Sequence, residues 1–200
     1  FHPVRGAVPP TVFIPVAEKI GLINTLGEWV LKTACAEAAS WATPLKVSVN
    51  VSPIQLMNTS LTDTIIGVLQ QTGLDPRRLD LEITESDVFN ENTRSLEILS
   101  QLREQGIQIS IDDFGTGYSS LSRLSYFPFD KIKIDRSFVI NIPEQKDDLD
   151  IVRLIISMGK SLHMRIVAEG VETEEQLTSL QALGCDLVQG YLIGKPSPLR

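Results

Sequence analysis

Residues 107–118 read Ile-Gln-Ile-Ser-Ile-Asp-Asp-Phe-Gly-Thr-Gly-Tyr, and the fold assignment starts from this stretch. Its first part, Ile107–Asp112, is short and rich in isoleucine, which is typical of a buried strand. Two adjacent carboxylates, Asp112 and Asp113, follow this run, and burying them without a partner would be electrostatically costly. Gly115 and Gly117 then allow the chain to turn tightly. The stretch predicts a strand whose carboxyl end carries paired acids and a glycine-rich loop.

The same succession of a short apolar run and a longer helical pattern recurs along the chain. Strands that alternate with helices pair in parallel through right-handed crossovers, so the sequence predicts an α/β fold. The repeat averages about 28 residues, close to the roughly 31 per unit of a (β/α)8 barrel. The predicted strands are Lys46–Val51, Leu79–Thr84, Ile107–Asp112, Lys131–Asp135, Arg165–Ala168 and Asp186–Tyr191. The predicted helices are Phe13–Trp41, Ile54–Thr72, Thr93–Gln105, Ser119–Leu124, Leu149–Leu162 and Glu174–Leu183.

Six predicted strands are two fewer than a closed barrel requires. The chain opens with Phe1-His2-Pro3 and has no initiator methionine, so we expect the first two strands of a modified (β/α)8 TIM-type barrel to lie upstream of residue 1. An open six-stranded sheet is the alternative. No linker divides the chain, so residues 1–200 are expected to form a single domain.

Polar side chains follow the predicted strands at the same end. In a barrel these ends converge on one mouth, where active sites lie. A group of carboxylates there needs neutralising cations, and Lys133 supplies one positive charge. All-oxygen ligands select hard ions such as Mg²⁺ or Mn²⁺, so we expect a two-metal site. Taken singly, each acid could equally be a helix cap or a solvated loop residue. The strand-end residues are Asn50, Glu82, Asp112, Asp113, Lys133, Glu169 and Gln189.

The composition excludes several classes of protein. The chain has 200 residues and a net charge of −7, so general binding of DNA is not expected. No apolar stretch is long enough to span a membrane, and no signal peptide opens the sequence. Cys35 and Cys185 are far apart and are expected to be buried, reduced thiols of a cytoplasmic protein, whose parent could still be membrane-anchored. The polar segment Asn141–Asp150 is expected to be a solvated loop.

The sequence resembles the EAL domain family of bacterial cyclic di-GMP phosphodiesterases over essentially its whole length. The stretches 112–121 (DDFGTGYSSL) and 168–173 (AEGVET) are the most specific matches. The other matching stretches are Phe13–Glu18, Asn50–Ser52, Glu82–Glu85, Lys131–Val139 and Gln189–Tyr191. The resemblance implies a modified (β/α)8 barrel that hydrolyses cyclic di-GMP to linear pGpG.

The resemblance also implies residue roles. Asn50, Glu82, Asp112 and Asp113 would bind metal, with Glu169 at or beside the second ion. Lys133 would contact the attacking water or the phosphate, and Gln189 would join the substrate or water network; with Glu169, these are the catalytic candidates. Glu85 would hold the glycine-rich loop, and Glu172 would support the cluster. The loop that meets the substrate would comprise Gly115, Thr116, Gly117 and Tyr118.

The family's assembly suggests two further expectations. A homodimer would form through Ser119–Leu124 and the neighbouring apolar loop Tyr126–Phe129. A sensory or GGDEF-type domain would be fused to this one in the parent protein.

One departure from the family pattern bears on activity. The Glu-Ala-Leu motif, whose glutamate is a metal ligand in the family, would precede His2-Pro3 and is absent. Truncation and true loss both explain this absence, and truncation is the simpler reading. A catalytically silent receptor for cyclic di-GMP is therefore the alternative to an enzyme. A glycosidase with two carboxylates around a sugar bond is a third reading. The adjacent aspartates, the strand-end lysine and an aromatic content of 6% argue against it.

Overall fold

The computed structural model describes residues 4, 6–85, 93–116, 124, 127 and 129–197. The chain divides into two compact units. The first comprises Phe1–Leu81 and Thr93–Ile107, and the second comprises Glu82–Asn92 and Gln108–Arg200. The strands of the sheet are hydrogen-bonded in chain order, β1-β2-β3-β4-β5-β6.

The first unit is mainly helical. Helix α2 contacts α1, α3, α4 and the first strand. Its elements are α1 (Pro10–Lys19), α2 (Ile23–Ser40), β1 (Val47–Asn50), α3 (Pro53–Leu56), α4 (Leu61–Thr72), the 3₁₀ helix η1 (Pro76–Arg78), the start of β2 (Leu79–Thr84) and α6 (Thr93–Glu104).

Two helices expected to be continuous are each interrupted. The stretch Phe13–Trp41 is divided between α1 and α2, and Gly21 lies between them with a φ of +76° that ends the first helix. The stretch Ile54–Thr72 is divided between α3 and α4. There the side chain of Asn58 accepts a hydrogen bond from the backbone N–H of Ser60 at 3.1 Å, an Asx turn that competes with helix.

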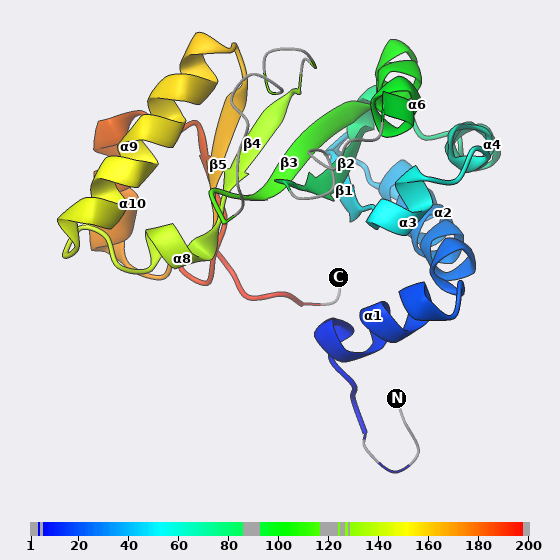
Figure 1. Cartoon of the computed structure of the whole chain (residues 1–200), viewed down its shortest axis with the longest axis horizontal. Coiled ribbons are helices and arrows are strands. Elements are labelled where there is room, and N and C mark those ends of the chain that lie inside the picture. Colours follow the sequence, from blue (N-terminus) through cyan, green and yellow to red (C-terminus); the bar gives the residue numbers. More distant parts are fainter. Residues whose placement is uncertain are drawn as a thin grey trace. The chain divides into compact units, whose positions relative to one another are not determined.

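The second unit carries the remaining parallel strands and the helices beside them. Strands β3 and β4, β4 and β5, and β5 and β6 pair in parallel. Helix α9 packs against β4 and β5 (Figure 1). The elements are β3 (Gln108–Phe114), β4 (Lys131–Ile134), α8 (Arg136–Val139), α9 (Lys146–Ser161), β5 (Arg165–Ala168), α10 (Glu174–Leu183) and β6 (Leu187–Val188).

All six predicted strands are present, five with small shifts of their ends and the sixth, predicted as Asp186–Tyr191, reduced to Leu187–Val188. The core of the second unit forms because the strands are rich in isoleucine, and Ile109, Ile111, Ile132, Ile134 and Ile166 are fully buried. Every residue of β4 is buried, as expected of a strand covered on both faces. The α/β class predicted from the sequence is therefore confirmed.

Two sequence-based expectations about the second unit are wrong. Helix α9 begins at Lys146, so the second half of the segment 141–150, which was expected to be a solvated loop, is helical. Asp147 and Asp148 lie in its first turn, where carboxylates favour the helix because they face its positive end. Cys185 is only half-buried, although Cys35 is buried and both thiols are free.

Candidate functional site

Lys133 lies at the centre of an acidic cluster in the second unit. Its Nζ lies 2.8 Å from Oε2 of Glu82, 2.9 Å from Oδ1 of Asp112 and 2.7 Å from Oε1 of Glu169. The side chain of Lys133 is 7% exposed, and the three carboxylates are 10% to 18% exposed. The four residues come from β2, β3, β4 and the residue that follows β5, so the carboxyl ends of these strands converge as the sequence predicts.

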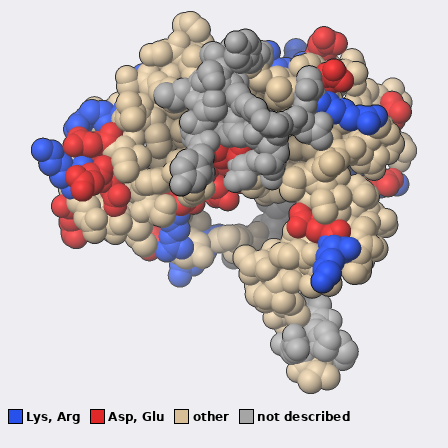
Figure 2. All heavy atoms as spheres, in the orientation of Figure 1, with Lys and Arg blue, Asp and Glu red and all other residues tan. Residues whose placement is uncertain are grey.

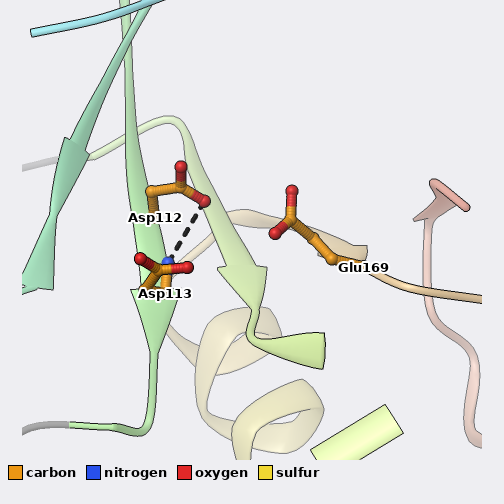
Figure 3. Close-up of side chains that lie close together, drawn as sticks. All are labelled: Asp112, Asp113 and Glu169. Atoms are coloured by element: carbon orange, nitrogen blue, oxygen red, sulfur yellow. Dashed lines mark hydrogen bonds between the residues drawn. The ribbon is translucent and has the colours of Figure 1, made fainter. Parts of the chain in front are cut away.

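A β-bulge places both aspartates at this cluster. Adjacent residues of a regular strand point to opposite faces, so Asp112 and Asp113 would normally diverge. The register between β3 and β4 shifts between Ile111 and Phe114, and Asp113 has a φ of +53°, in the left-handed region. As a result, carboxylate oxygens of Asp112, Asp113 and Glu169 all lie within 4.8 Å of one another (Figure 3). The Asp113 N–H donates to Oδ1 of Asp112 at 3.1 Å.

Electrostatics keep Lys133 charged. Burial by itself would lower the pKa of the Lys133 ammonium, but the carboxylates of Glu82, Glu169 and Asp112 outweigh it. The net result is a pKa above the ordinary value for lysine. Lys133 therefore carries a full positive charge at neutral pH, and it acts as a hydrogen-bond donor in the cluster.

Two carboxyl groups in the cluster have raised pKa values. Burial raises the pKa of Glu169, and the charges of Asp112 and Glu82 add to this, while Lys133 opposes it. Burial also raises the pKa of Asp113, with a further contribution from the charge of Asp112. The charged form of both carboxyl groups is therefore disfavoured in this setting. A nearby cation would stabilise that charged form.

The start of the glycine-rich loop is held by Glu85, which directly follows β2. Gly115 N–H donates to Oε2 of the buried Glu85 at 2.8 Å, which is the contact expected of Glu85. Thr116 Oγ1 donates to the carbonyl oxygen of Asp113 at 2.8 Å. Gly115 has a φ of +102°, which disfavours any side chain at this position. Gly117 and Tyr118 lie outside the described residues, as do residues 119–123 of the predicted helix Ser119–Leu124.

Gln189 contributes through its backbone in the described structure. Its N–H donates to the carbonyl of Ala168 at 2.8 Å, and its carbonyl accepts from the N–H of Val171 at 3.1 Å. The end of β6 is thereby tied to the turn that carries Glu169. The side chain of Gln189 is exposed.

Asn50 belongs to the first unit and lies at the exposed end of β1. There it borders a cavity of about 130 Å³, which Gln55 and Asn58 also line. The cluster in the second unit comprises Glu82, Asp112, Asp113, Lys133 and Glu169.

The apolar loop expected to take part in a dimer is described only in part. Phe127 and Phe129 are buried, and their ring centroids lie 4.5 Å apart. These two rings pack inside the protein. Tyr126 lies outside the described residues, and the homodimer stays a prediction.

The sequence analysis missed two polar side chains beside the cluster. Arg136 follows β4 and pairs with Glu172 at 2.7 Å, and the buried Gln176 donates to the carbonyl of Ile140 at 3.1 Å. The sequence did contain a signal for Arg136, because this cationic residue directly follows Asp135 at the end of a predicted strand. Gln176 also caps α10, where its side chain and that of Thr173 each accept a hydrogen bond from the other residue's backbone N–H.

The surface of the described residues carries mixed charge. On the face shown in Figure 2, acidic and basic groups are interspersed around α9 and α10, with no continuous basic patch among the coloured residues. Among the described residues, no helix is both long and apolar enough to cross a membrane.

The fold and the acidic cluster together define the class of protein. It is a parallel α/β protein with an acidic site, centred on a lysine, at the carboxyl ends of its strands. The EAL domain model matches residues 1–196, so the chain belongs to the EAL domain family. The resemblance identified from the sequence is thus confirmed.

Similar proteins share most of this chain's length. It is 54% identical over 198 residues to an uncharacterized signaling protein of Caulobacter vibrioides. It is 44% identical over 202 residues to the cyclic di-GMP phosphodiesterase NbdA of Pseudomonas aeruginosa. These matches cover 99% of this chain but only 24% and 26% of the relatives, so the chain spans about a quarter of their length.

Solved structures have the same fold. The phosphodiesterase PaMucR in complex with c-di-GMP matches with a TM-score of 0.94 and 44% identity, over 98% of this chain and 81% of that one. The EAL domain of DcpA from Mycobacterium smegmatis matches with a TM-score of 0.83 and 42% identity, over 88% of this chain and 81% of that one. These neighbours and the parallel α/β sheet agree with the modified TIM-type barrel expected from the sequence.

Proposed function

We propose that this domain hydrolyses cyclic di-GMP to linear pGpG with the help of Mg²⁺ or Mn²⁺. The observation that carries the proposal is the contact of the Lys133 ammonium with three carboxylates at the strand ends, in a chain of the EAL family. Support comes from NbdA and MucR, relatives whose names include cyclic di-GMP phosphodiesterase activity. The PaMucR structure contains c-di-GMP and matches this fold closely.

The cluster has the donor set that a hard divalent cation requires. Carboxylate oxygens of Asp112, Asp113 and Glu169 lie within 4.8 Å of one another, so they could share an ion. We propose that these residues, with Glu82, hold a two-metal site, and the role of Asn50 as a further ligand stays a prediction. When bound, such ions supply Lewis-acid stabilisation of phosphoryl oxygens and activation of water.

Lys133 is suited to stabilise negative charge. Because its pKa is raised, it keeps its proton at neutral pH and cannot act as a general base. Its ammonium can donate to a phosphoryl oxygen, or to the attacking water, as negative charge develops in the transition state. Its position among three carboxylates fixes the ammonium in place before the substrate arrives.

Glu169 is the carboxylate that we propose to take a proton from the attacking water. Burial raises its pKa toward the range useful for proton transfer near neutral pH. Its Oε1 is held at 2.7 Å from Lys133, so its orientation is defined. Glu85 keeps the loop after β3 close to these groups through Gly115. Gln189 is proposed to contact substrate or water.

Incubation with cyclic di-GMP and Mn²⁺ or Mg²⁺, followed by chromatography for pGpG, tests the proposal. A chain extended upstream to include the segment with the Glu-Ala-Leu motif serves as a parallel sample. Asp112→Asn should abolish turnover while far-UV circular dichroism stays unchanged. Asp150→Asn, which changes an exposed aspartate paired with Arg153, is the matched control and should retain activity. Full activity of Asp112→Asn would refute the assignment of Asp112.

Binding without hydrolysis is the second candidate. The observation that favours it is that Lys133 alone contacts three carboxylates, so the cluster is partly neutralised without a divalent ion. Calorimetry with cyclic di-GMP in the presence of EDTA distinguishes the two. Tight binding without metal, together with no pGpG under any metal condition, would identify a receptor.

The parent protein is proposed to contain further domains. The chain spans about a quarter of its curated relatives, and MucR is named as bifunctional, with diguanylate cyclase as its other activity. We propose fusion to a sensory or GGDEF-type domain, a homodimeric assembly and a cytoplasmic site of action. Light scattering of the purified chain tests the dimer.

A further inference from the structure

Gln176 forms a buried bridge between two elements of the second unit. The residue is 4% exposed. Its Oε1 accepts hydrogen bonds from the N–H groups of Glu172 at 2.7 Å and Thr173 at 3.0 Å, at the start of α10. Its Nε2 donates at 3.1 Å to the carbonyl of Ile140, the C-cap residue of α8. A side chain that only capped α10 would not need this last bond.

Arg136 makes a second connection between the same elements. Its Nη2 lies 2.7 Å from Oε1 of Glu172, and its aliphatic stem lies against Gly170. A Cβ built on Gly170 would come within 2.2 Å of Cγ of Arg136, and Gly170 has a φ of +71°. Glycine is therefore required at this position by both the backbone conformation and the arginine stem. We call the set Arg136, Glu172, Gln176 and the Ile140 carbonyl the α8–α10 bridge.

The α8–α10 bridge joins two segments, one that follows Lys133 and one that follows Glu169. Lys133 lies three residues before Arg136 on β4, and Glu169 lies three residues before Glu172, just after β5. The last bond from this segment to β4 runs from the N–H of Glu169 to the carbonyl of Ile134 at 3.2 Å. Beyond it, the chain turns at residues 170–173. The N–H of Val171 donates to the carbonyl of Gln189 on one side of this turn, and the bridge connects the turn to α8 on the other.

We propose that Gln176 and Arg136 are positioning residues that hold the Glu169 carboxylate against the Lys133 ammonium. The backbone pairing of β4 with β5 places the two strands, since Lys133 is opposite Val167 and Ile134 is opposite Ala168. The bridge then fixes the turn that orients Glu169. A carboxylate that takes a proton, or that shares a metal ion, gains from such support because small displacements reduce its effect strongly. The inference rests on the proposed function only for its effect on catalysis.

Gln176→Glu is the sharpest test, because it separates the two tasks of this side chain. Glutamate is also a natural residue at the third position of a capping box, so it can still accept from Glu172 and Thr173. A carboxylate cannot donate to the Ile140 carbonyl, so the link to α8 is lost. We expect kcat for cyclic di-GMP to fall roughly 10- to 100-fold, with a smaller change in KM. The ¹⁵N signal of the Lys133 ammonium, assigned by its loss in Lys133→Arg, should shift.

Thr173→Ala is the matched control. It removes the side-chain cap of α10, in which Thr173 Oγ1 accepts from the N–H of Gln176, and leaves the link to Ile140 intact. We expect kcat and the Lys133 signal to stay near those of the unmodified protein. Equal effects of Gln176→Glu and Thr173→Ala would show that only helix stability matters, which would overturn the inference. An unchanged kcat and Lys133 signal in Gln176→Glu would overturn it as well.

Arg136→Met removes the contact between Arg136 and Glu172, and we expect this variant to fold. Arg136 has a side chain that is 53% exposed, so its replacement leaves no buried charge, and methionine retains an aliphatic stem over Gly170. The Lys133 signal should shift in this variant too. If the unmodified protein proves unable to hydrolyse cyclic di-GMP, the proposed function fails, while a shift of the Lys133 signal in both variants still supports the positioning role.

Discussion

A Cβ atom on Gly190 would lie 2.1 Å from the carbonyl oxygen of Val171 and 2.3 Å from its nitrogen. The contact is with backbone atoms, so no side-chain rotation can relieve it. Val171 is itself fully buried, and its carbonyl accepts a hydrogen bond from the N–H of Leu192 at 3.0 Å. The segment after β6 therefore packs directly on the turn that follows Glu169.

Gly190→Ala should consequently disturb both stability and the site. We expect the free energy of unfolding to fall by about 1–3 kcal/mol, as for other overpacking changes, and hydrolysis of cyclic di-GMP to fall with it. Urea denaturation and the rate of pGpG formation measure the two effects. Gly194→Ala is the control, because a Cβ at Gly194 would meet nothing within 4 Å. Equal stability of the two variants would contradict this account of Gly190.

Lys133→Met tests the electrostatic role of the central ammonium. The change removes the cation from three mostly buried carboxylates and leaves their charges uncompensated. We expect the free energy of unfolding to fall by about 3 kcal/mol or more. We also expect kcat to fall by roughly 10²- to 10³-fold, because charge stabilisation is lost. Thermal melting and steady-state kinetics measure the two quantities.

Lys146→Met provides the comparison for Lys133. Lys146 is exposed at the start of α9, so its replacement should change neither melting temperature nor kcat appreciably. A Lys133→Met protein that turns over substrate at the unmodified rate would exclude Lys133 from the chemistry.

The local patterns of the sequence predicted the strands and the convergence of their polar ends. Short runs rich in isoleucine, valine or leucine that alternate with helical patterns are typical of strands in an α/β chain. The adjacency of Asp112 and Asp113 predicted an acidic site. The bulge that turns both carboxylates toward Glu169 was not predictable, because strict alternation would separate them.

Contacts between residues far apart in the chain could also not be predicted from the sequence. Arg136 and Glu172 are 36 residues apart, and Gln176 and Ile140 are separated equally far. No periodic pattern encodes such pairs, since they depend on the tertiary placement of two turns. The break between α3 and α4 depends on the side chain of Asn58, and the pattern of hydrophobic residues does not predict this break.

The reactivity of Cys35 follows from its burial. Burial raises the pKa of the Cys35 thiol from 9.0 to about 11. Because the thiolate is the reactive form, iodoacetamide at pH 8 should modify Cys35 only after unfolding, and the half-buried Cys185 should react first. Peptide mass spectrometry with and without urea measures this order. Rapid modification of Cys35 in the native protein would contradict its placement in the core.

The same shift makes stability depend on pH. Between pH 9 and pH 11 the folded protein keeps the Cys35 proton, and the unfolded chain loses it. The unfolded state binds fewer protons in this range, so the free energy of unfolding should decrease as the pH rises. Cys35→Ala should reduce this dependence. An equal slope in both proteins would assign the effect to other groups.

Arg78 and Arg77 are neighbours with very different surroundings, and this pair allows a matched test of hydrogen bonding in the first unit. Arg78 Nη2 donates to the carbonyl of Ala38 at 2.7 Å, and its Nε donates to the carbonyl of Leu45 at 2.8 Å. These bonds satisfy a carbonyl of the last turn of α2 and one of the segment before β1. Charged donors to backbone carbonyls contribute more than neutral ones, so Arg78→Ala should lower the free energy of unfolding by about 2–3 kcal/mol.

Arg77→Ala should cost much less, although Arg77 Nη2 lies 2.5 Å from Oδ2 of Asp75. The Arg77 side chain is 81% exposed and that of Asp75 is 39% exposed, so water screens the pair. We expect a loss of free energy of unfolding much smaller than that of Arg78→Ala, because a solvent-exposed ion pair contributes little. Urea denaturation of both variants at the same ionic strength gives the comparison. If the two substitutions destabilised the protein equally, the carbonyl bonds of Arg78 would contribute no more than a surface ion pair.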